Sequence, residues 1–163
     1  MLVGVVSDTH NNINNIKSIV ELFNENNVET VVHTGDITNA RSLEMFSELK
    51  CPLIGVFGNN DHSEEGLLDV CKKYKFDFRK PPLSLTLNER KIVIFHEPDL
   101  IKKYLEQEND VEIVLFGHTH RFVKEKIDDI ILFNPGESAG MIEGKNSIGL
   151  IDLDTLEIRR IFF

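Results

Sequence analysis

The chain has 163 residues, of which 41% are hydrophobic, and this length and apolar content suit one compact domain with a sizeable core. Its formal net charge of −9 argues against a surface for long DNA or RNA, because binding many phosphates requires clustered Lys and Arg. Since the sequence shows neither an apolar stretch long enough for a membrane span nor the basic start of a signal peptide, we expect a cytoplasmic protein without a membrane partner.

The first half of the chain alternates between short apolar strands and amphipathic helices. Strands are expected at residues 2–7, 28–34 and 53–57, and helices at about 13–26, 39–50 and 63–74. Asn11 or Asn12 is suited to cap the first helix, because an asparagine side chain accepts hydrogen bonds from free backbone N–H groups. This strand–helix order favours parallel strands joined by helical crossovers.

The pattern changes after residues 80–82. Leu83, Leu85 and Leu87 alternate with polar residues and lead through a short turn into residues 91–95, which predicts an antiparallel hairpin. The elements expected after the hairpin are a helix at 97–109 and strands at 111–116, 122–127, 130–133, 147–153 and 156–162. Parallel units followed by mostly antiparallel strands predict an α/β fold in which two sheets pack together, with helices outside.

Five predicted strands end in residues that are able to bind a metal ion. The stretches are Asp8-Thr9-His10, Gly35-Asp36, Gly58-Asn59-Asn60-Asp61, His96 and Gly117-His118-Thr119-His120. In extended backbone, side chains at positions i and i+2 point the same way, so Asp8 and His10 are expected to reach one ion together. The candidate metal ligands are therefore Asp8, His10, Asp36, Asn59, His96, His118 and His120.

Seven candidate ligands exceed the needs of one ion. Two divalent ions that shared Asp36 would each receive four protein ligands and would leave room for a bridging hydroxide and substrate oxygens. Mixed carboxylate and imidazole ligands suit transition metals better than Mg²⁺ or Ca²⁺; we expect manganese first, with nickel, iron, cobalt and zinc as alternatives. Two dications against two carboxylates leave a positive centre, which would attract an anion such as phosphate.

These motifs, in this order over residues 3–120, resemble the calcineurin-like metallophosphoesterase superfamily, and most closely its small archaeal and bacterial phosphodiesterases. The resemblance implies a four-layer αββα sandwich of two mixed sheets flanked by helices. It also implies which residues would bind each ion: Asp8, His10, Asp36 and His120 the first, and Asp36, Asn59, His96 and His118 the second. Paired ions activate a water and stabilise charge during in-line displacement at phosphorus, so the expected reaction is hydrolysis of a small phosphodiester.

Two positions depart from the family pattern. Asn60 stands where many members have a histidine that protonates the leaving group, so we expect aryl phosphodiesters to react far faster than alkyl monoesters. His62 could take over this role, although a surface or capping role is the simpler expectation. Glu97 stands where a glycine is more frequent, and it could donate a proton, accept a hydrogen bond from His96, obstruct the substrate, or simply favour the start of a helix.

Other residues receive supporting roles. Asn60, Asp61 and His96 are the candidate catalytic side chains, and Asp61 is expected to orient a neighbour of the site. His33 is expected to be a hydrogen-bonded core or supporting residue rather than a ligand. The turn at 134–137 also resembles a family turn near the site, although a plain tight turn needs no function.

Two alternatives remain open at the level of function and assembly. The chain could be an inactive scaffold on the same fold, as in the retromer subunit that this branch resembles; the complete set of seven ligand positions argues against this. The apolar residues Ile161, Phe162 and Phe163 are compatible with a homo-oligomer and equally with a buried last strand.

Overall fold

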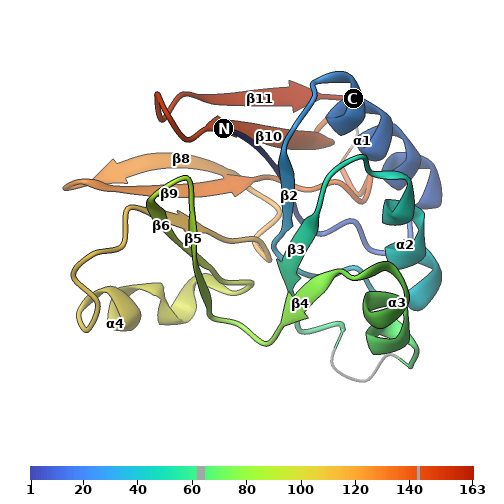
Figure 1. Cartoon of the computed structure of the whole chain (residues 1–163), viewed down its shortest axis with the longest axis horizontal. Coiled ribbons are helices and arrows are strands. Elements are labelled where there is room, and N and C mark those ends of the chain that lie inside the picture. The colour runs from blue at the N-terminus through green and yellow to red at the C-terminus, as the bar shows by residue number, and fades with distance from the viewer. Residues whose placement is uncertain (62–64, 143) are drawn as a thin grey trace.

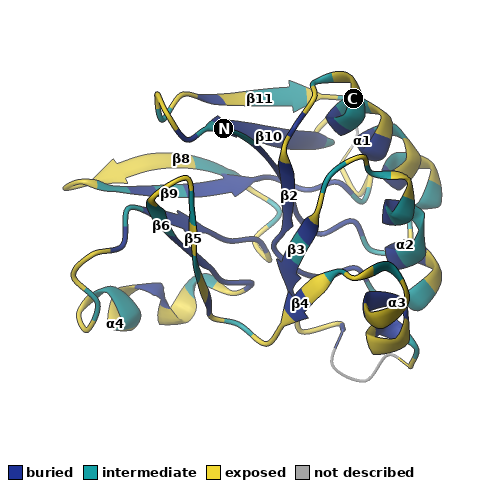
Figure 2. Cartoon of the chain, in the orientation of Figure 1, coloured by how far each residue is buried: buried dark blue, intermediate teal, exposed yellow. Residues whose placement is uncertain are grey.

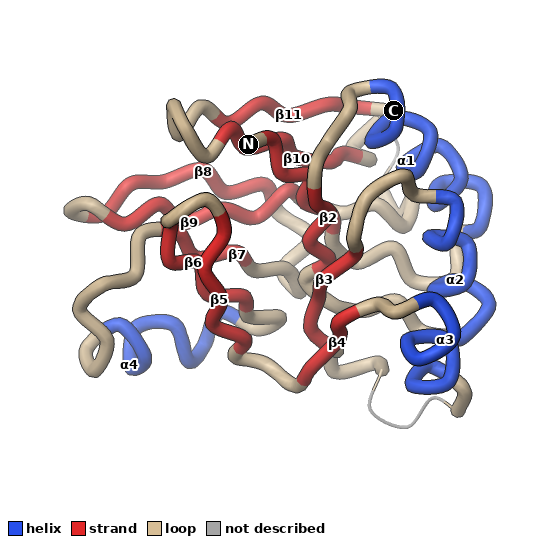
Figure 3. The backbone as a smooth tube through the Cα atoms, in the orientation of Figure 1, coloured by secondary structure: helices blue, strands red, loops and turns tan. Residues whose placement is uncertain are grey.

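The computed structural model describes residues 1–61, 65–142 and 144–163. Two β-sheets face each other, with α1, α2 and α3 beside the first sheet and α4 beside the second (Figure 1). Figure 3 shows these helices on the outer sides of the two sheets. The predicted four-layer sandwich of two mixed sheets flanked by helices is therefore confirmed.

The first sheet has six strands in the order β11-β10-β1-β2-β3-β4. Its strands are β1 (Leu2–Val6), β2 (Thr30–His33), β3 (Leu53–Val56), β4 (Asp77–Arg79), β10 (Ser147–Asp152) and β11 (Ile158–Phe162). The first four are parallel, whereas β10 pairs antiparallel with β1 and β11 antiparallel with β10. The helices beside this sheet are α1 (Ile13–Glu25), α2 (Ala40–Glu44) and α3 (Leu67–Tyr74).

The second sheet has five strands in the order β5-β6-β7-β9-β8. These strands are β5 (Leu83–Leu87), β6 (Arg90–Ile94), β7 (Ile113–Leu115), β8 (Phe122–Ile127) and β9 (Ile130–Pro135). The predicted hairpin is confirmed, since β5 and β6 pair antiparallel from Leu83↔Ile94 to Leu87↔Arg90. Most strand pairings of the second half are antiparallel, as expected, but β6, β7 and β9 are parallel to one another.

Several predicted helices are shorter in the structure. The helix expected at 39–50 divides into α2 and the 3₁₀ helix η1 (Met45–Glu48), and the helix expected at 97–109 divides into η2 (Pro98–Leu100) and α4 (Ile101–Leu105). Residues 106–110 are all polar and would offer a longer α4 no apolar side chain to bury, which is where most helical stability arises. The predicted start of α3 at residue 63 lies outside the described residues, and α3 itself begins after Gly66, whose φ of 84° is not helical.

Strand β4 was not expected from the sequence. It has three residues, and only Phe78 in its centre is buried. A segment this short shows no readable alternation, and it becomes a strand through parallel pairing with β3, from Ile54↔Asp77 to Val56↔Arg79.

Three apolar cores fill the spaces between the four layers. The first lies between α1–α3 and the first sheet, the second between the two sheets, and the third between the second sheet and α4. Strand β1 contributes to two of them, because Val6 belongs to the first core and Val3 and Val5 to the second. Figure 2 shows the result: strands in the middle of the molecule are buried, whereas most of β8 is exposed.

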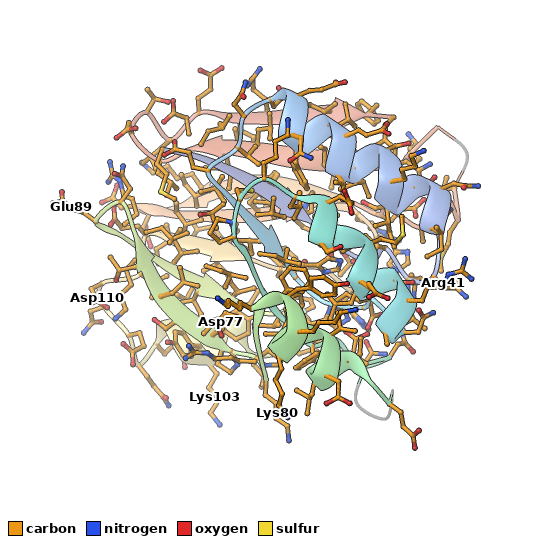
Figure 4. All side chains as sticks on the ribbon, turned by 45° about the vertical axis from the view of Figure 1, so that its right-hand side comes forward. Arg41, Asp77, Lys80, Glu89, Lys103 and Asp110 are labelled. Atoms are coloured by element: carbon orange, nitrogen blue, oxygen red, sulfur yellow. The ribbon has the colours of Figure 1, made fainter. Side chains whose placement is uncertain are left out.

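Charged side chains lie on the surface. Arg41, Asp77, Lys80, Glu89, Lys103 and Asp110 project outward from the ribbon in Figure 4. At the end of the chain, Ile161 and Phe163 pack against the first core, while Phe162 is exposed under the guanidinium of Arg160. Among the described residues, no helix has the length and apolar character that a membrane crossing demands.

Candidate metal centre

The seven predicted ligands lie at the ends of strands from both sheets. Asp8, His10, Asp36 and Asn59 follow β1, β2 and β3 of the first sheet, and His96, His118 and His120 follow β6 and β7 of the second. Since the strands within each of these two sets are parallel, their carboxyl ends share one edge of their sheet. Contacts between the sets, described next, place the two edges against each other.

The first group of possible ligands contains Asp8, His10 and His120, whose ligand atoms all lie within 4.8 Å of one another. The Nε2 atom of His120 is 3.4 Å from Asp8 Oδ1, and this carboxylate raises the pKa of His120. Nδ1 of His10 is 3.2 Å from the Thr38 hydroxyl, which leaves Nε2 to face the group. The first group thus combines one carboxylate with two imidazoles.

Two atoms of the first group are buried without a hydrogen-bond partner among the described residues. Among the described residues, none forms a hydrogen bond with Asp8 Oδ1 or with His10 Nε2. A buried acceptor left unsatisfied costs on the order of 1–3 kcal/mol, and such atoms in native proteins call for an explanation. A cation bound by both atoms would remove this cost, so the residues present fit a metal ion.

The second group contains Asp36, His96 and His118. Nδ1 of His96 donates to the backbone carbonyl of Thr34 at 2.9 Å, so a neutral His96 presents the lone pair of Nε2 to the site. That Nε2 lies 3.0 Å from Asn59 Oδ1 and 3.4 Å from Asp36 Oδ1. Three electron-rich atoms therefore converge, and a cation between them would satisfy all three.

The electrostatics of this group also favour a positive charge. Burial lowers the pKa of His96, but the facing carboxylate of Asp36 outweighs burial and leaves the pKa above its ordinary value. Burial likewise raises the pKa of Asp36, yet the facing imidazole of His96 and hydrogen bonds from Asn60 outweigh burial and hold this pKa well below its ordinary range. Asn59 Oδ1 also lies 3.0 Å from Nδ1 of the exposed His118. That Asp36 bridges both groups stays a prediction.

Most of the ligands have an unusual backbone conformation. The prediction that Asp8 and His10 lie in extended backbone was wrong, because both are left-handed, with φ angles of 51° and 45°. Left-handed residues other than glycine cost free energy and concentrate at functional sites. Backbone hydrogen bonds from Asp8 N to Gly35 O and from His10 N to Asp36 O help to hold them. The other ligands with a left-handed backbone are Asp36, His118 and His120.

Glycine allows the loops to approach closely. A Cβ atom at Gly58 would overlap both the carboxylate and the backbone nitrogen of Asp36. Gly35 has a φ of 109°, and a Cβ there would lie 2.6 Å from Nδ1 of His96. Both positions therefore require glycine for the loops after β2, β3 and β6 to meet.

Asp61 lies directly beneath the Asp36 loop. Its buried carboxylate accepts hydrogen bonds from the backbone N–H groups of Asp36, Ile37, Thr38 and Gly58, at distances between 2.7 and 2.9 Å. The sequence did not reveal which neighbour Asp61 orients, and the structure shows that it is the backbone of residues 36–38. Asp61 positions Asp36, and its two oxygens are occupied by this task.

Other supporting residues lie behind the ligands. His33 is completely buried, accepts a hydrogen bond from Gly35 N through Nδ1 and donates through Nε2 to Thr9, and burial lowers its pKa to about 3. The side-chain nitrogen of Asn134 donates to the carbonyl of Gly117 and thereby holds the loop of His118. From the sequence, Asn134 was expected only as part of a turn. No sequence pattern indicated that Thr38 lies beside His10.

Of the two positions that depart from the family pattern, Asn60 contacts the second group, whereas Glu97 only follows one of its residues in the chain. Asn60 donates to both carboxylate oxygens of Asp36, through its backbone nitrogen at 3.0 Å and its side-chain nitrogen at 2.7 Å. Glu97 is exposed and lies next to His96. Since His96 donates to Thr34, its hydrogen-bond acceptor is not Glu97. His62 lies outside the described residues.

The fold and these two ligand groups define a metal-binding α/β protein. Residues 1–156 match the calcineurin-like phosphoesterase superfamily domain, and the chain belongs to this superfamily. It is 33% identical to phosphodiesterase MJ0936 of Methanocaldococcus jannaschii over 99% of this chain and 98% of that protein. A solved structure of an archaeal phosphodiesterase superposes with a TM-score of 0.91 at 32% identity, with 100% of both chains covered.

More distant structures share only the fold. Vps29 of Entamoeba histolytica, solved as a complex with zinc, has a TM-score of 0.70 at 18% identity over 99% of each chain. The close relatives and the family together establish the class of enzyme: the chain is a metal-dependent phosphoric ester hydrolase.

Proposed function

We propose that the protein is a phosphodiesterase with a dinuclear metal centre, acting on small diesters. The observation that carries this proposal is the pair of ligand groups. The first group has two buried atoms without a hydrogen-bond partner in the described part of the chain, and in the second group three acceptor atoms face one another. The relative MJ0936, which is named a phosphodiesterase, supports the reaction class.

The residues divide by role. Asp8, His10, Asp36 and His120 would hold one ion, and Asp36, Asn59, His96 and His118 the other. When bound, two such ions supply activation of a water and neutralisation of phosphate charge. Asn59 and His118 are exposed, so the second group opens to solvent and lets a substrate approach. Asp61, His33 and Asn134 keep the ligand loops in place through the contacts described above.

Asn60 determines which leaving groups depart easily. Its amide donates to Asp36 and has no proton to give up at neutral pH, so it cannot serve as a general acid. We predict that the manganese-loaded protein hydrolyses bis(4-nitrophenyl) phosphate at least about a hundredfold faster than an alkyl phosphomonoester, because general-acid assistance contributes typically about 10²–10⁴-fold. Release of nitrophenol and of inorganic phosphate measures the two rates. Comparable rates would contradict the role given to Asn60.

The proposal is tested by metal content together with turnover. We expect about two manganese ions per chain by elemental analysis, hydrolysis of bis(4-nitrophenyl) phosphate, and loss of both in Asp36→Asn. Asp77→Asn, a surface change with the same loss of charge, serves as the control and should keep both. Metal bound without any turnover would instead favour the scaffold function, the alternative that the shared fold of Vps29 leaves open.

A further inference from the structure

A small hollow opens beside the second ligand group. Its volume is about 80 Å³, and its wall includes the two ligand residues Asn59 and His96. Most of the remaining wall is apolar and is formed by Phe57, Pro81, Pro82 and Leu100. Because ligand residues form part of the wall, the hollow adjoins the position that a phosphoryl group bound at the centre would occupy.

Glu97 is the charged residue of this wall. It is exposed at the start of η2, and its side chain makes no capping hydrogen bond to that turn among the described residues. His96 does not engage it either, since the two nitrogens of His96 face Thr34 and Asn59. The carboxylate is therefore free to interact with whatever occupies the hollow.

Building on the proposed phosphodiesterase activity, we propose that this hollow binds the leaving group and that Glu97 selects leaving groups that are apolar or aromatic and carry no anionic substituent. Apolar walls favour such groups, whereas a carboxylate repels an anionic one. Lys103, visible at the surface in Figure 4, lines an adjoining outer hollow of about 230 Å³ rather than this one. A polynucleotide, whose leaving side carries further phosphates, would be disfavoured by the same charge.

Two substrates that differ by one charge test the role of Glu97. Methyl 4-nitrophenyl phosphate and its 3-carboxy-4-nitrophenyl counterpart both release a coloured phenolate. With the manganese-loaded wild type we expect kcat/KM to favour the neutral leaving group by about tenfold, a gap that salt should narrow. Glu97→Gln should shrink the gap to about threefold or less, by improving the carboxylated substrate.

Asp99→Asn is the matched control. Asp99 is an exposed acid two residues away on the same turn and does not line the hollow, and its replacement removes the same charge. We expect the ratio of the two kcat/KM values to stay at its wild-type level in this variant. An equal narrowing in Asp99→Asn and Glu97→Gln would mean that net charge, rather than Glu97 in the hollow, sets the preference, and would overturn the inference.

Leu100→Ala tests the occupancy of the hollow itself. Leu100 is 58% exposed, so its truncation leaves the cores intact. We expect KM for methyl 4-nitrophenyl phosphate to rise about two- to fivefold, because part of an apolar wall is removed. The control Leu68→Ala, equally exposed on α3, should leave KM unchanged. Unchanged KM in Leu100→Ala would place the leaving group elsewhere.

A binding measurement separates this inference from the proposed function. Isothermal titration uses the two methyl benzylphosphonates that correspond to the substrates, in which a CH₂ group replaces the ester oxygen so that this bond is not cleaved. The wild type should bind the neutral analogue more tightly, and Glu97→Gln should remove most of that difference.

If the wild type hydrolyses neither diester, the proposed function fails, but the titration still tests the inference, since equal affinities for the two analogues would overturn it. If turnover is normal but its charge preference is unchanged in Glu97→Gln, the inference alone fails.

Discussion

Two buried polar residues support the ligand loops by accepting backbone N–H groups. His33 is held neutral in this way, since its Nδ1 accepts from Gly35 and burial lowers its pKa to about 3 from an ordinary value of 6.5. Asp61 accepts four backbone N–H groups that would otherwise be unsatisfied beside the site. His33 supports the fold in its neutral form, and Asp61 supports it through its two carboxylate oxygens.

His33 predicts an acid sensitivity. The unfolded chain binds a proton on His33 below pH 6.5, whereas the folded chain does not until about pH 3, so the free energy of unfolding falls as pH decreases across this window. The loss approaches about 1.4 kcal/mol per pH unit. Urea unfolding at pH 7.5, 6.5, 5.5 and 4.5, in EDTA so that metal release plays no part, should show the stability difference between wild type and His33→Asn shrinking as pH falls. A difference that stays constant would contradict a neutral buried His33.

Asp61→Asn should destabilise the protein by about 3 kcal/mol, because an amide offers one acceptor oxygen and turns an NH₂ group toward backbone donors. Urea unfolding monitored by circular dichroism measures the change. Asp77→Asn is the control, since that exposed carboxylate pairs with Arg79 at the surface and its loss should change stability by less than about 1 kcal/mol. Similar losses in both variants would mean that the four N–H contacts are not important for stability.

At the scale of elements, the start of α1 joins two loops of the site. Asn12 caps the helix by accepting from Asn15 N, and its side-chain nitrogen donates to the carbonyl of Ala139. Asn15 adds a second link, to the carbonyl of Ser138. The buried carboxylate of Glu137 in turn accepts backbone N–H groups from residues 139–142. The segment after His10 is thereby tied to the loop that follows β9.

The double role of Asn12 predicts an unequal effect of two similar substitutions. Asn39 caps α2 by accepting from Ser42 N but has no comparable long-range link among the described contacts, so Asn39→Ala should cost about 1 kcal/mol. Asn12→Ala loses a cap and a tether and should cost about 2 kcal/mol. Urea unfolding compares the two variants. Equal costs would indicate that the link to Ala139 does not contribute.

At the scale of the whole molecule, the metal centre lies where the two sheets meet. Four candidate ligands come from the first sheet and three from the second, and contacts such as Asp36 with His96 and Asn59 with His118 cross between them. Ions bound here would link the two sheets in the folded state and would have no equivalent site in the unfolded chain.

Metal should therefore stabilise the whole protein. We expect Mn²⁺ to raise the melting temperature in a concentration-dependent manner, with about 2.7 kcal/mol gained at a free concentration of 100 times the dissociation constant. Ca²⁺ should act less, because imidazole nitrogens are poor ligands for it. Differential scanning fluorimetry after EDTA treatment measures the shift, and Asp36→Asn should lose most of it. A melting temperature independent of Mn²⁺ in the wild type would argue against the site.

The sequence by itself determined the features that depend on neighbouring residues. The apolar stripe of α1, the β5–β6 hairpin and the position of the candidate ligands at strand ends follow from local spacing, because periodicity and turn residues act within a few positions. Together with the family resemblance, this information was sufficient for the fold class and for a candidate ligand set.

Only the tertiary structure decided what depends on pairing between distant residues. In the structure, β10 and β11 belong to the first sheet, and residues 77–79 pair as strand β4. Asp8 and His10 have a left-handed backbone, and Asp61 accepts four backbone N–H groups. Local spacing carries no information about these outcomes, since each is settled by hydrogen bonds and packing between segments far apart in the chain. The sequence shows that residue 97 is an acid. Only the packing of the two sheets places Glu97 in the wall of the hollow beside His96.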